Sequence, residues 1–264
     1  MKLSVNKIYN LDCFEMIRKI DDNCIDLAVI DPPYNMHVAQ WDSFKNTDLF
    51  LKFTYKWIDA LIPKLKDTGS IYIFNTPLNC TFILQHLLKK GLFFQNWITW
   101  DKRDGFCGTK KKFVSGQESI VFFTKSKKYM FNADDVRVPY ESTERIKAAT
   151  SKGILKNGKR WFPNPNGKLC GDVWHIVSER HKNKVNGKLK KQIHETPKPV
   201  ELIERIIKAS SKKGDLVFDC FVGSGTTAFV AKKLGRNYIC SDISKKYVDY
   251  TTQRLEALDE AIRK

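Results

Sequence analysis

The chain has 264 residues, of which 42% are hydrophobic, so it is long enough to bury the core of a folded, enzyme-sized protein. Its formal charge of +17 is expected of a protein that meets a polyanion. Seven cysteines with no C-x-x-C pair and no histidine at metal-like spacing argue against a metal site or a disulfide framework, and no leader or apolar membrane span is evident, so we expect a soluble, cytoplasmic protein.

The first elements place an acidic, proline-rich loop at the end of a buried strand. Residues 7–11 predict a strand, and Asp12 is placed to cap a short helix over residues 13–20. Residues 25–30 are mostly apolar and predict a strand that is buried on both faces. Asp31-Pro32-Pro33-Tyr34 then ends it, because neither proline has an N–H to donate. We expect this stiff loop at the carboxyl edge of an open α/β sheet, where ligands bind.

The next elements alternate between helix and strand. We predict helices over residues 49–65 and 78–90, and strands over residues 71–74, 93–100 and 119–123. This alternation is typical of a doubly wound, mostly parallel α/β sheet. Residues 101–112 are predicted to form a basic loop on its carboxyl edge, in which Lys110, Lys111 and Lys112 either contact phosphates or are simply solvated.

The periodicity fails over residues 136–195, where basic side chains are set among glycines and asparagines. Aromatic and amide side chains are interleaved with the cations, a mixture suited to holding phosphates while reaching base edges. We therefore predict a loop-rich, DNA-contacting insert. Its candidate contacts are Lys159, Arg160, Trp161, Asn164, Asn166 and Arg180, and Phe162, Trp174 and His175 belong to the same interleaved pattern.

A nucleoside-binding unit is predicted at the end of the chain. An amphipathic helix over residues 199–210 precedes a short strand, and the strand leads into the loop Asp219-Cys220-Phe221-Val222-Gly223-Ser224-Gly225-Thr226-Thr227. A helix to Gly235, a strand that ends at Asp242 and a closing helix follow. The two glycines allow close backbone approach, and Asp242 is placed to accept ribose hydroxyls. The same spacing fits a dinucleotide fingerprint, so a nicotinamide-dependent oxidoreductase is an alternative.

Three motifs resemble those of the S-adenosylmethionine-dependent DNA amino-methyltransferases. They are the Asp-Pro-Pro-Tyr loop, the glycine loop and His194-x-Thr196-x-Lys198-Pro199. The second departs from the usual proline at Cys220, and the third departs from a frequent proline at Glu195. Their order along the chain is that of the beta group of this family. The resemblance implies a Rossmann-like sheet whose halves, residues 1–135 and 196–264, flank a target-recognition insert over residues 136–195.

The resemblance also implies roles for individual residues. In the catalytic loop, Asp31 and the Pro32 carbonyl accept the hydrogens of a target amine, and Tyr34 stacks on the flipped base beside Pro33. Asp219 is assigned to the methionine ammonium and Asp12 to the region of the cofactor adenine, although a plain helix cap explains Asp12 equally well. The remaining residues implied to hold S-adenosylmethionine are Cys13 near adenine, Thr196 and Lys198 near the carboxylate, and Phe221, Ser224 and Thr226 in the glycine loop.

Longer segments refine the expected activity. Residues 31–35, 73–77, 96–105 and 158–167 resemble beta-group adenine methyltransferases, and the last of these lies in the insert. They imply N6-adenine methylation of double-stranded DNA in a GAAGA-like site, alongside a partner restriction endonuclease, and hint at a homodimer. An aspartate at position 31 leans toward adenine, since cytosine enzymes more often carry serine there. The alternatives are N4-cytosine methylation and a basic DNA-binding protein that transfers no methyl group.

Overall fold

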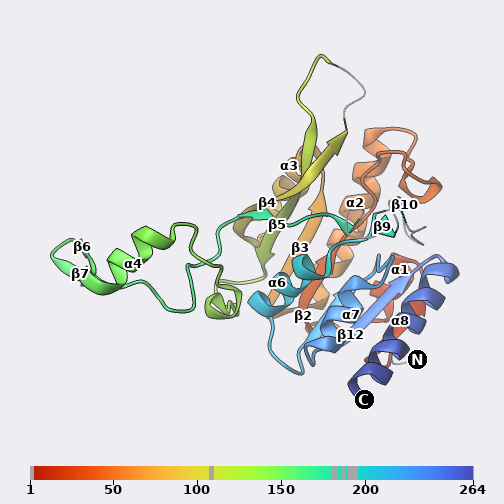
Figure 1. The fold of residues 1–264 in the computed structure, drawn as a ribbon. Helices are drawn as coiled ribbons and strands as arrows, with labels where there is room; N and C mark the ends of the chain where they lie inside the picture. Colours follow the sequence, from red (N-terminus) through yellow and green to blue (C-terminus); the bar gives the residue numbers. More distant parts are fainter. Residues whose placement is uncertain (1–2, 107–109, 180–183, 186–187, 190–195, 264) are drawn as a thin grey trace.

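The computed structural model describes residues 3–106, 110–179, 184–185, 188–189 and 196–263 (Figure 1). Its centre is an eight-stranded sheet with the order β1-β12-β11-β2-β3-β5-β4-β8. The five strands from β1 to β3 are parallel: β1 (Lys7–Asn10), β12 (Asn237–Asp242), β11 (Leu216–Asp219), β2 (Ile25–Ile30) and β3 (Leu65–Asn75). The predicted doubly wound, mostly parallel sheet is therefore confirmed.

The two ends of the chain build this sheet together. β1, from the start of the chain, pairs with β12, and β11 pairs with β2. The strand that leads into the proline loop and the strand that leads into the glycine loop are thus direct neighbours. Because both are parallel, their carboxyl ends lie at the same edge of the sheet. The topology therefore places the two predicted loops side by side.

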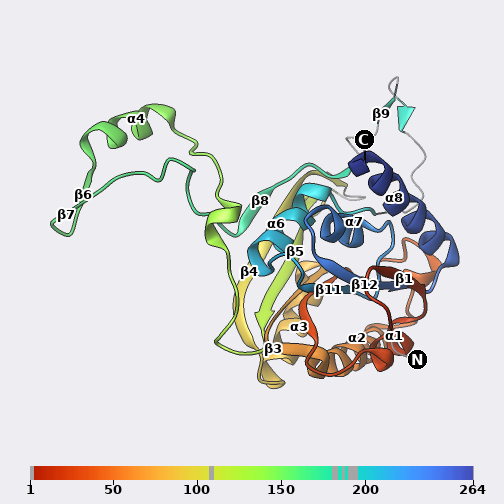
Figure 2. The same ribbon diagram turned by 90° about the horizontal axis from the view of Figure 1, so that it is seen from below.

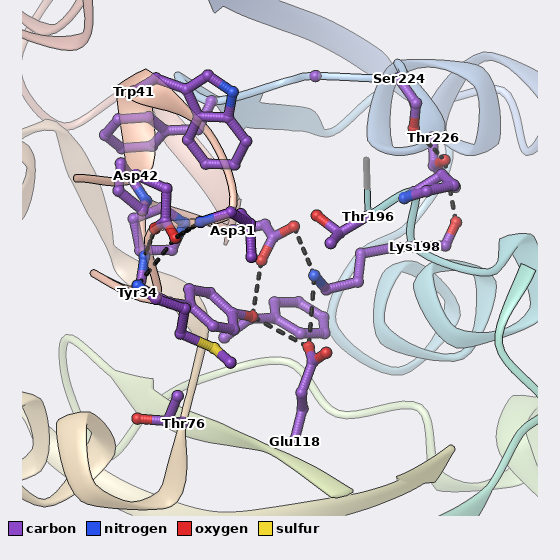
Figure 3. A pocket seen from close by; sticks show the side chains of 18 of the residues that line it. Asp31, Tyr34, Trp41, Asp42, Thr76, Glu118, Thr196, Lys198, Ser224 and Thr226 are labelled. Atoms are coloured by element: carbon purple, nitrogen blue, oxygen red, sulfur yellow. Dashed lines mark hydrogen bonds and ion pairs between the residues drawn. The ribbon is translucent and has the colours of Figure 1, made fainter. Parts of the chain in front are cut away.

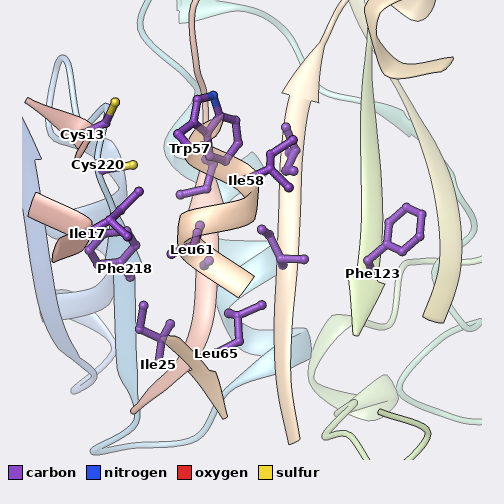
Figure 4. Packing of buried hydrophobic residues seen from close by; sticks show 14 of the residues in the cluster. Cys13, Ile17, Ile25, Trp57, Ile58, Leu61, Leu65, Phe123, Phe218 and Cys220 are labelled. Atoms are coloured by element: carbon purple, nitrogen blue, oxygen red, sulfur yellow. The ribbon is translucent and has the colours of Figure 1, made fainter. Parts of the chain in front are cut away.

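Helices cover both faces of the sheet (Figures 1 and 2). α1 (Cys13–Lys19), α2 (Thr47–Leu61) and α3 (Pro77–Lys89) pack on one face, where Trp57, Ile58 and Leu61 meet the strands (Figure 4). The helices of the other face are α6 (Val200–Ser210), α7 (Thr226–Lys233) and α8 (Lys245–Arg263). β2 alternates Ala28 and Ile30 toward the first cluster with Leu27 and Val29 toward the second. This confirms the prediction that β2 is buried on both faces.

The first half of the predicted loop over residues 101–112 is strand, since β4 continues to Phe106. β4 (Phe93–Phe106) and β5 (Ser115–Thr124) form a long antiparallel hairpin whose outer part projects beyond the sheet (Figure 1). The polar residues at the end of β4 have no alternating strand pattern, but pairing with β5 provides hydrogen-bond partners for their backbone groups. A register shift between Asp101 and Phe106 interrupts the pairing where the hairpin leaves the core. β5 is antiparallel to β3 as well.

Part of the predicted insert forms an arm that projects from the body in both views (Figures 1 and 2). The arm consists of α4 (Thr143–Lys152), β6 (Ile154–Lys156) and β7 (Lys159–Trp161). Asn157 and Gly158 join the two strands with φ values of 51° and 74°. An Asn-Gly pair with both residues at positive φ is a favoured two-residue hairpin turn.

Another part of the insert belongs to the main sheet. β8 (Val173–His175) pairs with the edge of β4, and Trp174 and Ile176 are buried in the same cluster as α6. Trp174 therefore packs in the core, in contrast to the DNA-contacting pattern in which the sequence placed it. Two further short strands, β9 (Lys184–Val185) and β10 (Lys188–Leu189), pair with each other.

In the ranges that the structure describes, no helix has the length and apolar character that crossing a membrane requires. Nor do the described His, Cys, Asp and Glu side chains include a group of three or more that could hold a metal ion. The six cysteines in this part of the chain are free thiols, and Cys13, Cys80, Cys220 and Cys240 are buried.

Candidate active site

A cavity of ≈ 1460 Å³ lies at the carboxyl edge of the parallel strands. It is lined by all four residues of the Asp-Pro-Pro-Tyr loop and by every predicted cofactor residue except Gly225. Figure 3 shows Asp31 and Tyr34 across from Thr196, Ser224 and Thr226. The structure thus brings to one cavity two loops, residues 31–34 and residues 219–227, that lie about 190 positions apart in the sequence.

A buried carboxylate fixes the shape of the proline loop. Asp42, which is 1% exposed, accepts the backbone N–H groups of Tyr34 at 2.5 Å, Asn35 at 2.9 Å and Met36 at 2.9 Å. The chain turns around this side chain, with Asn35 at a φ of 60°. From the other side, Asn79 donates to the Tyr34 carbonyl at 2.8 Å. The loop is therefore held in place before any ligand binds.

Asp31 and Tyr34 belong to a network of charges at the base of the cavity (Figure 3). The Lys198 ammonium lies 2.6 Å from Asp31 Oδ2 and 3.4 Å from Glu118 Oε2. The Tyr34 hydroxyl lies 2.8 Å from Asp31 Oδ1 and 3.1 Å from Glu118 Oε2. Lys102 adds a second cation, 3.2 Å from Glu118 Oε1. Two carboxylates thus face two ammonium groups around one phenol.

Burial and charge set the protonation of this network. Burial pushes the pKa of Lys198 down, but Asp31 and Glu118 outweigh it and raise that pKa above its ordinary value. Burial pushes the pKa of Glu118 up, but Lys198 and Lys102 hold it below its ordinary value. Burial, with Asp31 and Glu118 adding to it, raises the pKa of Tyr34 well above 10. At neutral pH the network therefore contains an ammonium, a Glu118 carboxylate and a neutral phenol.

Lys198 lines the cavity and its ammonium contacts two carboxylates. The sequence placed it near the cofactor carboxylate, but its ammonium faces Asp31 and Glu118. Burial favours this arrangement, because a lysine that is 7% exposed needs carboxylate partners to remain charged. The Lys198 carbonyl accepts the Thr226 hydroxyl at 3.1 Å, which ties this segment to the start of α7.

The glycine loop turns tightly between β11 and α7. Gly225 caps α7 with a φ of 79°, and a Cβ there would overlap the Thr251 side chain of α8. Gly223 has a φ of 48°, and its N–H donates to Asp242 Oδ2 at 2.9 Å. Ser244 N–H donates to the other oxygen of Asp242 at 2.8 Å. These bonds hold the carboxylate of Asp242 at the cavity wall.

Asp219 is the buried acid of this loop, with an exposed fraction of 2%. Its Oδ1 accepts the Phe221 N–H at 2.9 Å. Burial outweighs this bond and raises the pKa of Asp219 to about 7. A carboxyl group that gives up its proton near neutral pH inside a cavity is suited to a cationic ligand group, because a cation would stabilise the ionised form.

Asp12 is a helix cap in the structure, and it also lines the cavity. Its Oδ1 accepts the N–H groups of Phe14 at 2.8 Å and Glu15 at 3.0 Å. β1 is a neighbour of β2 along the chain but not in the sheet, where Asn10 stands opposite Asp242. Asp12 and the buried Cys13 therefore lie at the Asp242 end of the cavity, away from Asp31.

The predicted DNA contacts fall on two surfaces. Lys110, Lys111 and Lys112 are exposed on the β4–β5 hairpin, directly before cavity-lining residues. Lys159, Arg160 and Trp161 are exposed on the arm, where Arg160 binds the Lys152 carbonyl. Asn164 accepts the Asn166 N–H at 2.9 Å in the turn that follows. Arg180 lies outside the described residues.

Sequence reasoning missed Asp42 and Glu118 as site residues. Because β5 is antiparallel, its start lies at the edge where the parallel strands end, so Glu118 reaches Tyr34. If β5 were parallel to the other strands, its start would lie at the opposite edge of the sheet, away from Tyr34. The available signal was an acid, Glu118, two positions before the apolar run 120–123.

The fold and this cavity define an α/β enzyme with a nucleoside-type pocket beside a fixed acidic loop. Residues 25–253 match the DNA methylase family N6_N4_Mtase, and the chain belongs to that family. The nicotinamide-dependent alternative is therefore wrong. Type II methyltransferase M1.MboII of Moraxella bovis is 61% identical over 257 residues, which cover 97% of this chain and 99% of that protein. M.HpaI of Haemophilus parainfluenzae is 34% identical, with coverage of 93% and 73%.

Solved structures agree with this assignment. The complex of M1.HpyAVI with S-adenosylmethionine is 25% identical, has a TM-score of 0.63, and is matched over 94% of this chain and 98% of that one. The cytosine-N4-specific PvuII DNA methyltransferase has a TM-score of 0.70 at 16% identity, with coverage of 96% and 87%, and shares the fold.

Proposed function

We propose that the protein is a type II DNA methyltransferase that moves a methyl group from S-adenosylmethionine to N6 of a flipped adenine in duplex DNA. The observation that carries this proposal is the fixed Asp31–Tyr34 loop within the same cavity as the glycine loop. The 61% identity to M1.MboII, a type II methyltransferase, supports it. We further propose a GAAGA-like target, a partner endonuclease and action as a homodimer.

The residues of the cavity fit S-adenosylmethionine. Asp219 offers an acidic partner for the cationic amino end, and Asp242 offers carboxylate oxygens for ribose hydroxyls. Asp12 and Cys13 border the remaining part of the pocket, toward the adenine. The cofactor supplies an electrophilic methyl group on a sulfonium. We propose that the protein orients the target amine toward it.

The amine requires help, because the lone pair of an exocyclic amino nitrogen is delocalised into the ring. We propose that the Asp31 carboxylate and the Pro32 carbonyl accept the two N6 hydrogens, which would favour a pyramidal nitrogen with its lone pair directed at the methyl group. These contacts strengthen as positive charge develops on nitrogen, so they stabilise the transition state more than the ground state. The ring of Tyr34 offers a flat face for the extruded base.

The surrounding charges suit this role for Asp31. Each of its oxygens has a partner, Tyr34 on one side and Lys198 on the other, and each retains a further lone pair for a substrate hydrogen. A carboxylate only accepts hydrogen bonds, as the role requires. We propose that Asp31 or water takes the proton once the methyl group has been transferred, when the nitrogen becomes acidic.

The choice of base is the part of the proposal that most needs a direct test. Aspartate at position 31 favours adenine, whereas the PvuII enzyme shows that the same fold also serves N4 of cytosine. The two products differ only in which nucleoside carries the label.

The experiment incubates the protein with radiolabelled S-adenosylmethionine and duplexes that contain or lack GAAGA, followed by digestion to nucleosides. We expect label in N6-methyladenine, confined to GAAGA duplexes. Label in N4-methylcytosine would replace the adenine proposal with the cytosine alternative. Tight DNA binding with no label in any nucleoside would support the non-catalytic alternative.

A further inference from the structure

The rim of the cavity carries an exposed phenylalanine next to a run of lysines. Phe113 lines the cavity and is nevertheless 97% exposed, so it lies at the opening. Val114, which follows it, also lines the cavity and is 58% exposed. Lys110, Lys111 and Lys112 directly precede Phe113 and are exposed. A large aromatic side chain in this position gains nothing from the fold itself.

The residues that follow Phe113 along the chain reach the catalytic loop, because Glu118 contacts Tyr34. Glu118, whose carboxylate lies 3.1 Å from the Tyr34 hydroxyl, is five positions after Phe113. An extended chain of that length spans about 16 Å. Residues 113–118, which include the start of β5, therefore connect the opening of the pocket, where Phe113 lies, to the side chain of Tyr34.

A base that rotates out of a duplex leaves a gap in the stack and an unpaired partner. Proteins that distort DNA often insert an apolar side chain such as phenylalanine between base steps. Such a side chain must lie at the opening of the pocket that receives the base and close to cations that hold the phosphates. Phe113 meets both requirements in the part of the chain that the structure describes.

We propose that Phe113 enters the DNA duplex at the target base pair and fills the space that the flipped base vacates, while Lys110, Lys111 and Lys112 bind the neighbouring phosphates. The surface formed by Lys110, Lys111, Lys112 and Phe113 thus binds double-stranded DNA. The cluster of cations favours DNA over a second copy of this chain, because two copies of this basic rim would repel each other. The inference rests on the proposed adenine methylation.

The experiment compares Phe113→Ala with the unaltered protein and with the matched control Leu88→Ala. Leu88 is a large apolar residue on α3 that is 49% exposed and does not line the cavity. Three GAAGA duplexes each carry 2-aminopurine in place of one adenine, and its fluorescence rises when the base leaves the stack. Methylation is measured on a normal duplex and on one with an abasic site opposite the target.

We expect Phe113→Ala to lose the fluorescence rise and to methylate the normal duplex roughly tenfold to a hundredfold more slowly, the range expected for loss of one aromatic stack. Cofactor affinity should be unchanged, and the abasic duplex, whose target is already unpaired, should recover most of the rate. Phe113→Trp should retain activity.

Equal flipping and equal rates for Phe113→Ala and Leu88→Ala would overturn the inference. It would also be overturned if Phe113→Ala converted a dimer to a monomer, since the side chain would then cover a second copy. If the unaltered protein itself placed no methyl group on adenine, the proposed function would fail first, and the two failures are thereby distinguished.

Discussion

At the scale of single residues, Lys198 joins the cofactor half of the site to the catalytic loop. Its ammonium is buried between Asp31 and Glu118, although the side chain belongs to the segment that precedes α6. Removal of one partner from a buried ionic cluster leaves the others uncompensated. The stability of the fold and the geometry of the site therefore depend on the same side chain.

Lys198→Met is expected to lower the free energy of unfolding by up to about 3–5 kcal/mol, because Asp31 loses its ammonium partner and Glu118 keeps only Lys102. Urea denaturation measures this. Adding Glu118→Gln to the variant should recover part of the loss, since one of the two partly buried negative charges is removed. Lys102→Met is the matched control and should cost less, because Lys102 is more exposed and Glu118 keeps Lys198. Equal losses for the two lysine variants would contradict this account.

Asp219 gives the folded protein a pH dependence of its own. Because its pKa rises from 3.8 to about 7 on folding, the folded state binds the proton more tightly than the unfolded state does. The contribution of Asp219 to the free energy of unfolding is therefore greatest below pH 4, falls as the pH rises toward 7, and is constant above pH 7.

Between pH 5 and pH 8 this group should cost the protein about 2–3 kcal/mol of unfolding free energy, and Asp219→Asn should lack that cost. Denaturation curves at the two pH values measure it. Parallel pH profiles for the variant and the unaltered protein would rule out the raised pKa. If Asp219 holds the cationic end of the cofactor, cofactor affinity should also rise with pH up to about 7.

At the scale of elements, the 136–195 region divides into a part that stabilises the sheet and a part that projects from it. In β8, Trp174 is 6% exposed and its indole N–H donates to the Gly171 carbonyl at 2.7 Å. The Arg205 guanidinium of α6 lies over its ring at 5.1 Å. In β7, Trp161 is 60% exposed on the arm. The same residue type thus occurs in two opposite environments.

These two tryptophans form a matched pair for substitution. Trp174→Ala should destabilise the fold by about 3–5 kcal/mol, as expected for loss of a buried aromatic side chain. Trp161→Ala should change stability by less than about 0.5 kcal/mol and instead weaken DNA binding. Thermal unfolding and DNA titration separate the two effects. A stability loss at Trp161 as large as that at Trp174 would show that the arm is part of the core.

The elements also show what a single sequence reveals and what it hides. The strand before Asp31 and the glycine loop before Gly225 were predicted from apolar runs and turn residues, which are local signals. The direction of β5 was not predicted, because it depends on pairing with strands that are distant in sequence. For the same reason Glu118, at the start of β5, was missed as a site residue. The extended β4 and the contacts of Lys198 likewise depend on neighbours distant in sequence. The hairpin at Asn157-Gly158 carried a local signal that was available but went unused.

At the scale of the whole molecule, the charge of +17 is the property most directly visible in solution. Lys110, Lys111 and Lys112 on the hairpin and Lys159 and Arg160 on the arm are exposed. In the cavity, Lys102 and Lys198 are paired with acids. DNA binding should therefore release counterions, and cofactor binding should not.

DNA affinity should accordingly fall by roughly 10³ to 10⁵ between 50 and 200 mM salt if six to ten phosphates are bound, while cofactor affinity changes little. Alanine at Lys110, Lys111 and Lys112 together should reduce the slope of log affinity against log salt by about one for each phosphate that the variant no longer binds. Fluorescence anisotropy over a salt series measures both. A slope that these substitutions leave unchanged would remove the hairpin from the DNA interface.

The central claim is that Asp31 binds the target amine more tightly in the transition state than in the ground state. The most direct measurement is the single-turnover rate of methyl transfer by Asp31→Asn, with cofactor and DNA affinities measured in parallel. Glu118 still pairs with Lys198 in this variant, so the fold should persist. We predict that the rate falls by roughly a hundredfold or more while both affinities stay within about threefold. An unchanged rate, or a loss confined to binding, would contradict the account.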